Sequence, residues 1–144
     1  MSRNNRCSKH SCPVCYKPRL NKPLDSTDNV LRCLKMIKNQ NQEYFVCLSL
    51  DSSYKLIRQR VVCIGTLDSV IAHPREVFSG PLKDSAKYII IAHNHPSGET
   101  RPSKQDISTT QQLIAAGRIL GIPIHDHFIV SGNAYFSFKR QRLI

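Results

Sequence analysis

The sequence contains no tryptophan and few acidic residues, and both shortages bear on which partners the chain can bind. Its 144 residues hold ten Asp and Glu against 21 Lys and Arg, which gives a formal net charge of +11. Such a balance favours contact with a polyanion or with an acidic partner surface. The aromatic residues are only five Tyr and five Phe, so no aromatic-rich surface for stacking nucleobases is evident.

The sequence also lacks a long apolar run and an apolar segment near its start. We therefore expect no membrane partner, no secretory signal and a location in the cytoplasm. The length suits one domain. Six basic and no acidic residues lie in 1–23 and three more basic residues in 139–144, whereas 24–138 hold 12 basic against 10 acidic residues. This division predicts a basic arm or small zinc knuckle over 1–23 and a globular domain over 24–144.

Four residues of the arm have side chains that zinc accepts as ligands. Cys7, His10, Cys12 and Cys15 lie within nine residues, and the Cys12 to Cys15 spacing suits half of a tetrahedral thiolate site. The single residue between His10 and Cys12 is tighter than ordinary zinc knuckles have. The segment is thus either a structural zinc site or a basic tail with free thiols, and its Lys and Arg residues suit phosphate contacts in both cases.

Hydrophobic periodicity predicts alternating helices and strands, and hence a mixed α/β domain. The run from Tyr88 to Ala92 is apolar throughout, which is typical of a strand buried on both faces. Gly80-Pro81 is expected to break the helical stretch 75–87 into two short pieces. We expect helices at 26–37 and 103–120 and strands at 44–50, 54–64, 88–92, 122–130 and 134–138.

Two histidines at the end of the apolar strand indicate a metal site. Side chains two residues apart on a strand project to the same side, so His93 and His95 can share one ion. Asp106, in the first turn of the following helix, would be a third, anionic ligand. Two histidines and one carboxylate leave a tetrahedral position for water, as in catalytic zinc sites. Zinc lowers the pKa of such a water to about 7 and polarises a carbonyl, so the site still needs a base.

The order His93-x-His95, seven residues, Ser103, two residues, Asp106 resembles the JAMM motif of the JAB1/MPN family of zinc metallopeptidases. Glu43 matches the glutamate that this family places at the start of its first core strand. The resemblance covers roughly residues 26 to 138. Four further segments are similar to the bacterial RadC branch, namely Gly65-Thr66-Leu67-Asp68, His73-Pro74-Arg75-Glu76, Ala92-His93-Asn94-His95-Pro96-Ser97-Gly98 and Asp126-His127-Phe128-Ile129-Val130.

This resemblance implies a fold, an activity and a role for each residue of the motif. The fold would be a central mixed β-sheet flanked by helices, with a cytidine-deaminase-like architecture. The activity would be hydrolysis of a peptide or isopeptide bond in a peptide or protein substrate, with Zn²⁺ as cofactor. His93, His95 and Asp106 would bind zinc, Glu43 would be the general base, and Ser103 would stabilise the oxyanion. Longer RadC relatives carry an amino-terminal helix-hairpin-helix region, for which we expect this chain to have no room.

Some of these roles have competing interpretations. Ser103 and Asp106 also match a capping box, in which Ser103 satisfies free N–H groups of the helix. Glu76 competes with Glu43 as the base, although a carboxylate at a helix start is also favoured by the helix dipole. His125 and His127 alternate along a strand and would allow metal binding, but we favour one buried, hydrogen-bonded histidine there.

A different class of function also fits the charge. The chain would then be a DNA-associated protein, related to repair or recombination, that binds nucleic acid through its basic arm. A metal-free scaffold and a metal-dependent nuclease are further alternatives. The complete set of motif residues favours the hydrolase, while the charge of the termini favours an accessory contact. The sequence leaves the oligomeric state open.

Overall fold

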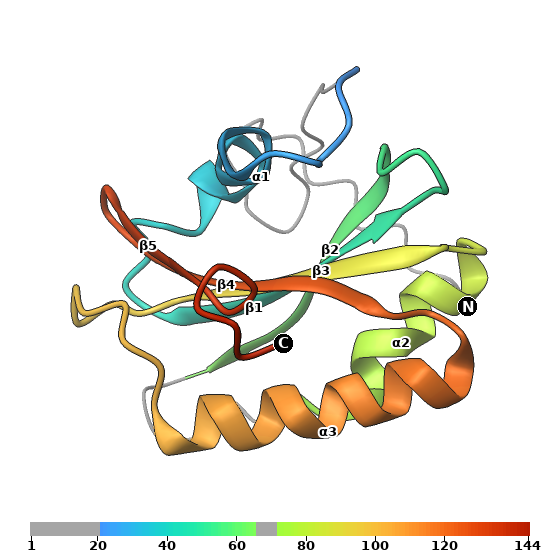
Figure 1. The fold of residues 1–144 in the computed structure, drawn as a ribbon. Helices are drawn as coiled ribbons and strands as arrows, with labels where there is room; N and C mark the ends of the chain where they lie inside the picture. The colour runs from blue at the N-terminus through green and yellow to red at the C-terminus, as the bar shows by residue number, and fades with distance from the viewer. Residues whose placement is uncertain (1–20, 66–71) are drawn as a thin grey trace, which may run out of the picture.

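The computed structural model describes residues 21–65 and 72–144, and these form one mixed sheet with helices on both faces (Figure 1). The elements in chain order are α1 (Thr27–Cys33), the 3-10 helix η1 (Leu34–Met36), β1 (Glu43–Leu50), β2 (Leu56–Gly65), α2 (Pro74–Lys83), β3 (Tyr88–Asn94), α3 (Lys104–Leu120), β4 (Ile124–Ser131) and β5 (Ala134–Ser137). The strand order is β2-β1-β3-β4-β5. Among the described strands β3 and β4 pair in parallel, and the other neighbours are antiparallel. The predicted mixed α/β class is confirmed.

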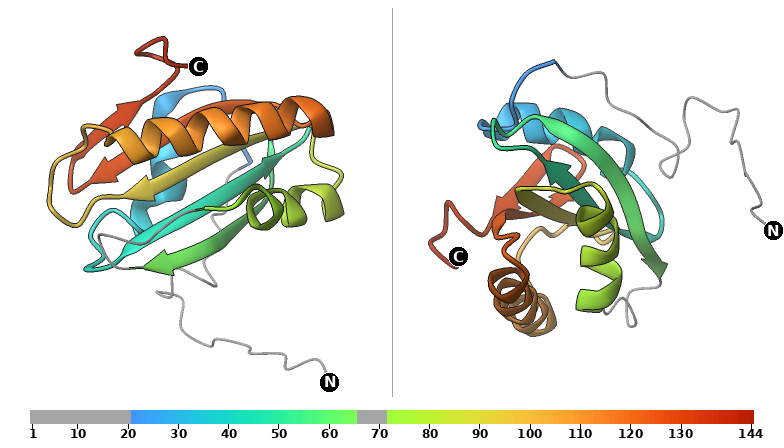
Figure 2. Two further views of the ribbon diagram at one scale, coloured as in Figure 1. Left: turned by 90° about the horizontal axis from the view of Figure 1, so that it is seen from below. Right: turned by 90° about the vertical axis from the view of Figure 1, so that its right-hand side faces the viewer.

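Two apolar cores lie on the two faces of the sheet, because successive side chains of a strand point to opposite sides. Phe45 and Cys47 of β1 pack in the core under α2 and α3, whereas Val46 packs in the core under α1. Figure 2 shows α2 and α3 together on one side of the sheet and α1 on the other. The alternation places odd-numbered residues of β3 on the α3 side and even-numbered ones on the α1 side.

The middle strand β3 is buried along its length, as its apolar run predicts. Residues Ile89 to Ala92 are fully buried, since β3 has β1 and β4 as neighbours and a helical layer on each face. The chain leaves β3 at Asn94, passes through a loop, and enters α3, which returns it to β4 in parallel. The carboxyl end of β3 therefore lies close to the amino-terminal end of α3.

The expected break at Gly80-Pro81 is wrong, because α2 runs unbroken from Pro74 to Lys83 with Pro81 inside it. Pro81 lies near the end of the helix, where a proline removes one hydrogen bond and the chain is about to leave the helix anyway. The backbone continues with Asp84 N–H donating to Gly80 O at 3.0 Å and Ala86 N–H donating to Pro81 O at 3.0 Å. Both Gly80 and Pro81 are buried, so packing outweighs local propensity here.

The helices predicted at 26–37 and 103–120 are both present, with small changes at their ends. The former is α1 followed by η1, since the geometry changes from α to 3-10 after Cys33. The latter is α3, which is capped by Ser103 and ends at Gly121, whose φ of 70° is left-handed, as the glycine predicts. In 21–65 and 72–144, no helix combines the length and apolar character that crossing a bilayer requires. The predicted Cys7, His10, Cys12, Cys15 site, and Thr66 to Asp68 of the resemblance, fall outside the described residues.

Candidate metal centre

Four side chains that the sequence separates by up to 63 positions meet at one end of the sheet: Glu43, His93, His95 and Asp106. Each offers one ligand atom, and these atoms all lie within 4.8 Å of one another. Strand pairing explains the position of Glu43. Phe45 of β1 is opposite His93 of β3, so Glu43, two residues earlier on β1, lies beside His95 in the antiparallel pair.

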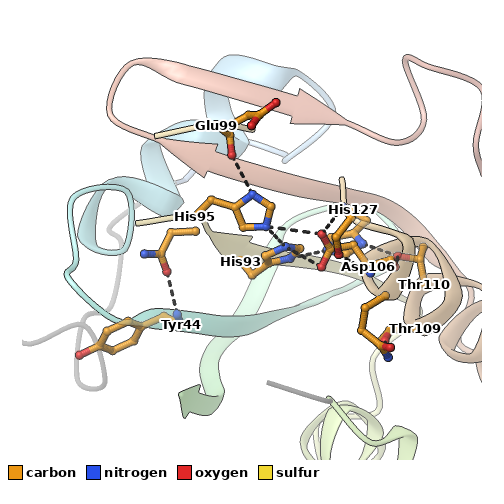
Figure 3. Close-up of polar contacts among 11 residues, drawn as sticks. Tyr44, His93, His95, Glu99, Asp106, Thr109, Thr110 and His127 are labelled. Carbon is orange, nitrogen blue, oxygen red and sulfur yellow. Dashed lines mark hydrogen bonds and ion pairs between the residues drawn. The ribbon is translucent and has the colours of Figure 1, made fainter. Parts of the chain in front are cut away.

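The two histidines and Asp106 form the closest part of this cluster (Figure 3). The Nε2 atoms of His93 and His95 are 3.0 Å apart. Asp106 directs one carboxylate oxygen to each ring, at 3.2 Å from His93 Nε2 and 3.5 Å from His95 Nε2. His93 is buried, while His95 and Asp106 are partly exposed, so the cluster is reached from solvent on the His95 side.

Ser103 and Asp106 form the predicted capping box at the start of α3. The Asp106 N–H donates to Ser103 Oγ at 3.0 Å, and the Ser103 N–H donates to Asp106 Oδ2 at 2.7 Å. The cap uses the Ser103 oxygen as an acceptor, so the hydroxyl proton is left to donate elsewhere. Capping and a contact with substrate are therefore compatible for Ser103, and the cap also orients the Asp106 carboxylate toward the histidines.

The surroundings move the pKa values of the two carboxyl groups in opposite directions. Burial raises the pKa of Glu43, although His93 and His95 oppose this. Burial would also raise the pKa of Asp106, but hydrogen bonds with the two imidazoles outweigh it and hold that pKa well below its usual range. The hydrogen bond with Asp106 raises the pKa of His95 against the effect of burial. Asp106 thus stays anionic, as a ligand must, and Glu43 has the raised pKa that suits a proton carrier.

The hydrogen bonds of His95 fit a cation bound at the cluster. His95 Nδ1 lies 2.8 Å from the Glu99 carbonyl oxygen, which can only accept, so Nδ1 carries the hydrogen and Nε2 of the neutral ring is bare. That bare nitrogen faces His93 Nε2 and a carboxylate of Asp106. With both rings neutral these would be three acceptors in contact, so either a proton or a metal cation must lie between them. Two imidazole nitrogens and one carboxylate are a ligand set that zinc takes in catalytic sites.

His127 and Thr110 extend the cluster inward, and the sequence interpretation did not include them in the site. His127 is 1% exposed and its Nε2 is 2.9 Å from His93 Nδ1. Its Nδ1 is 2.7 Å from Thr110 Oγ1. Burial lowers the pKa of His127 far below its ordinary value, and His93 lowers it further. The expected buried, hydrogen-bonded histidine of the His125/His127 pair is thus His127, whereas nothing in the sequence marks Thr110.

Asn94, between His93 and His95, lies on the other face of the sheet by the alternation of β3 and hydrogen-bonds to the strand that carries Glu43. Its Oδ1 accepts from the Tyr44 N–H at 2.7 Å. Its Nδ2 donates to Gln42 O at 2.9 Å. These contacts fix the backbone on both sides of Glu43, and Asn94 is fully buried.

The competing glutamate, Glu76, lies elsewhere. It is exposed in the first turn of α2 and lines a cavity with Arg60 and Lys83. It is not a member of the cluster of possible ligands found among residues 21–65 and 72–144. The geometry therefore favours Glu43 over Glu76 as the group that would act on a water at the metal.

Comparison with known proteins gives one consistent result. The profile of the RadC-like JAB domain matches residues 24–143. A UPF0758 protein of Protochlamydia amoebophila is 44% identical over 108 residues, which are 75% of this chain and 47% of the relative. A UPF0758 protein of Alkaliphilus oremlandii is 42% identical over 120 residues, which are 83% of this chain and 51% of the relative. The chain spans about half the length of the curated relatives it matches.

Proposed function

The chain belongs to the family of RadC-like JAB domains, and from this family and the geometry of the metal centre we propose that it is a zinc-dependent hydrolase that cleaves a peptide or isopeptide bond. One observation carries the proposal: two imidazole nitrogens and an anionic carboxylate converge within 4.8 Å of a second carboxyl group whose pKa burial raises. His93, His95 and Asp106 would hold the ion. Glu43 would be left for proton transfer.

Zinc at such a site supplies an acidified water and polarises the carbonyl of the scissile bond. The protein's own groups would do the rest. Glu43 would take the proton of the attacking water and deliver it to the leaving amine, which needs a carboxylate close to the metal but not coordinated tightly by it. The Ser103 hydroxyl, whose proton the cap leaves free, would donate to the oxygen anion that develops on the attacked carbonyl.

The experiment measures bound zinc together with hydrolysis of a panel of peptides and isopeptides. Glu43→Gln is expected to retain stoichiometric zinc and to lose turnover by about 10²-fold to 10⁴-fold, because general base catalysis contributes about that much. Glu76→Gln is the matched control, since it removes the same charge from an exposed glutamate outside the cluster. Zinc binding with turnover unchanged in Glu43→Gln would overturn the proposed mechanism.

Contact of the basic residues 1–23 with nucleic acid is a separate proposal that rests on their charge. The six basic residues of this segment predict an affinity for DNA that falls steeply with salt. Deletion of 1–23 should abolish that salt dependence and leave zinc binding at the metal centre unchanged. Equal DNA affinity with and without the segment would exclude it as the contact.

A further inference from the structure

We propose that Thr110 and His127 are positioning residues that fix His93 in a single tautomer, with Nδ1 protonated and Nε2 bare. Both residues lie outside the group of possible ligand atoms. They act through a chain of hydrogen bonds that runs from the Asp106 carbonyl of α3, through Thr110 and His127, to His93 of β3. The inference rests on the proposed function, because a bare Nε2 matters only if a cation is bound there.

The direction of the hydrogen bonds is set at Thr110. Its Oγ1 lies 2.6 Å from the Asp106 carbonyl oxygen and 2.7 Å from His127 Nδ1. The carbonyl oxygen can only accept, so the single hydroxyl proton of Thr110 goes to it. The His127 Nδ1 must then carry a hydrogen and donate it to Thr110 Oγ1. The reverse arrangement would leave two acceptor oxygens in contact at 2.6 Å.

The tautomer of His127 in turn determines the tautomer of His93. The His127 ring is buried, and its hydrogen-bond partners among the described residues are His93 and Thr110 rather than a carboxylate, so the ring is neutral. A neutral ring with hydrogen on Nδ1 has a bare Nε2, which accepts from His93 Nδ1 at 2.9 Å. Neutral His93 then presents a bare Nε2 to the Asp106 carboxylate at 3.2 Å and to His95, where a cation would bind.

Packing holds the His127 ring in the plane that this chain of hydrogen bonds needs. The ring is stacked on Phe138 with centroids 4.5 Å apart and planes within 12°, and it meets Phe45 on another side at 5.9 Å. Asp106 lies at both ends of the chain of contacts, with its carbonyl at Thr110 and its carboxylate at His93. The position of α3 and the orientation of the His93 ring are therefore linked.

The test combines nitrogen-15 NMR of the imidazole rings with zinc competition titrations of the full chain. In the wild type, His127 should show Nδ1–H with a bare Nε2, with and without zinc. Thr110→Val removes the hydroxyl and should weaken zinc binding by about 10-fold to 100-fold, the usual effect of losing a hydrogen-bond partner of a metal ligand. Thr110→Ser keeps the hydroxyl and should restore the wild-type affinity.

Thr109→Val is the matched control, because Thr109 is the neighbouring buried threonine of α3 and its hydroxyl accepts from Gln105 instead. If Thr110→Val does not fold, His127→Gln and His127→Leu decide: the glutamine amide can accept from His93 and donate to Thr110, and the leucine cannot. Wild-type zinc affinity in Thr110→Val or His127→Leu, or a bare Nδ1 on His127, would overturn the inference. A wild type that binds no zinc but shows the stated tautomer refutes the proposed function alone.

A second inference is carried by a groove of about 340 Å³ between α1, η1 and the β4–β5 turn. It lies on the face of the sheet opposite α3, with Leu31, Leu34 and Val130 as apolar lining and Arg32, Lys35 and Lys38 as basic lining. Asp28 is the one acidic residue that lines it. Ser131 lies between Val130 and Gly132, which line the groove. Its hydroxyl donates to the His95 carbonyl oxygen at 2.8 Å.

We infer that this basic groove binds an acidic polypeptide segment with an apolar side chain, on the face of the sheet opposite the candidate metal centre. Charge complementarity selects this occupant over others. Residues 1–20 of the chain itself carry five basic and no acidic residues, and a second copy carries +11, so both would be repelled. The apolar lining favours a peptide over a nucleic acid, whose phosphates need no such surface.

A fluorescein-labelled peptide of glutamates around one leucine is the probe, and anisotropy on the metal-free full chain is the measurement. Arg32→Glu combined with Lys35→Glu should weaken binding roughly tenfold, whereas Lys55→Glu with Lys87→Glu, an equal charge change at exposed residues that do not line the groove, should not. Equal loss in both pairs, undiminished binding of a glutamine version of the peptide, or tighter binding of a single-stranded oligonucleotide would overturn the inference. Because no cleavage is measured, the result is independent of the proposed chemistry.

Discussion

Replacing Ser103 by alanine and by glycine separates its two roles at the start of α3. Its oxygen accepts from the Asp106 N–H at 3.0 Å, which is a contribution to stability. Its proton is free for a substrate oxygen, which would be a contribution to turnover. Alanine removes both functions. Glycine also removes the hydroxyl, but it is itself a tolerated residue at the N-cap.

The magnitudes follow from the cap geometry. An N-cap serine replaced by alanine costs about 1 kcal/mol of unfolding free energy, and one replaced by glycine only a few tenths. For a chain of this length, about 1 kcal/mol corresponds to a Tm lower by roughly 2–4 °C. The other half of the capping box, the Ser103 N–H donating to Asp106, is a backbone contact and survives in both variants. Loss of an oxyanion donor costs about 10²-fold in turnover, and this loss should be equal in the two variants.

Urea unfolding and turnover, both measured on zinc-loaded protein, check the two parts separately. Ser108→Ala is the control, because it makes the same change at an exposed interior position of α3 and should stabilise slightly, in line with helix propensity. Equal destabilisation by alanine and glycine would show that the side chain is not acting as a cap. Full turnover in Ser103→Gly would refute the oxyanion role.

Three further predictions concern packing, charge and the strand that carries the base. Gly117→Ala would place a Cβ 2.6 Å from the Ile122 carbonyl oxygen, so urea unfolding should show a net loss of about 1–2 kcal/mol after the gain in helix propensity; a more stable variant would refute this. Asp84 has a pKa lowered by its hydrogen bonds with Arg60, so the stability lost in Asp84→Asn should be present at neutral pH and vanish as pH falls through that lowered pKa; a constant difference would contradict it. Asn94→Leu should lower turnover more than zinc affinity, and an equal fall in both would disprove the positioning of the base.

The proximity of His93, His95 and Asp106 was predictable because they are local in sequence and have a recognisable spacing. His93 and His95 needed only the alternation of a strand, and Asp106 only the cap at the next helix. Thr110 was not predictable, since it meets His127 through the packing of α3 against β4, and a threonine on a buried helix face resembles any core residue. The break expected at Pro81 failed for a similar reason: burial of Gly80 and Pro81 overrides the local preference.

The four site residues fall into two groups by their separation along the sequence. His93, His95 and Asp106 fall within 14 consecutive residues, whereas Glu43 precedes His93 by 50. The contacts among these three groups are therefore short-range in sequence. They require only β3, the loop that follows it and the first turn of α3. Glu43, the proposed base, reaches the other three only through the pairing of β1 with β3, a long-range contact that closes a loop of about 50 residues. The three groups that would hold an ion therefore depend on a local segment of the chain, whereas the position of the proposed base depends on the sheet.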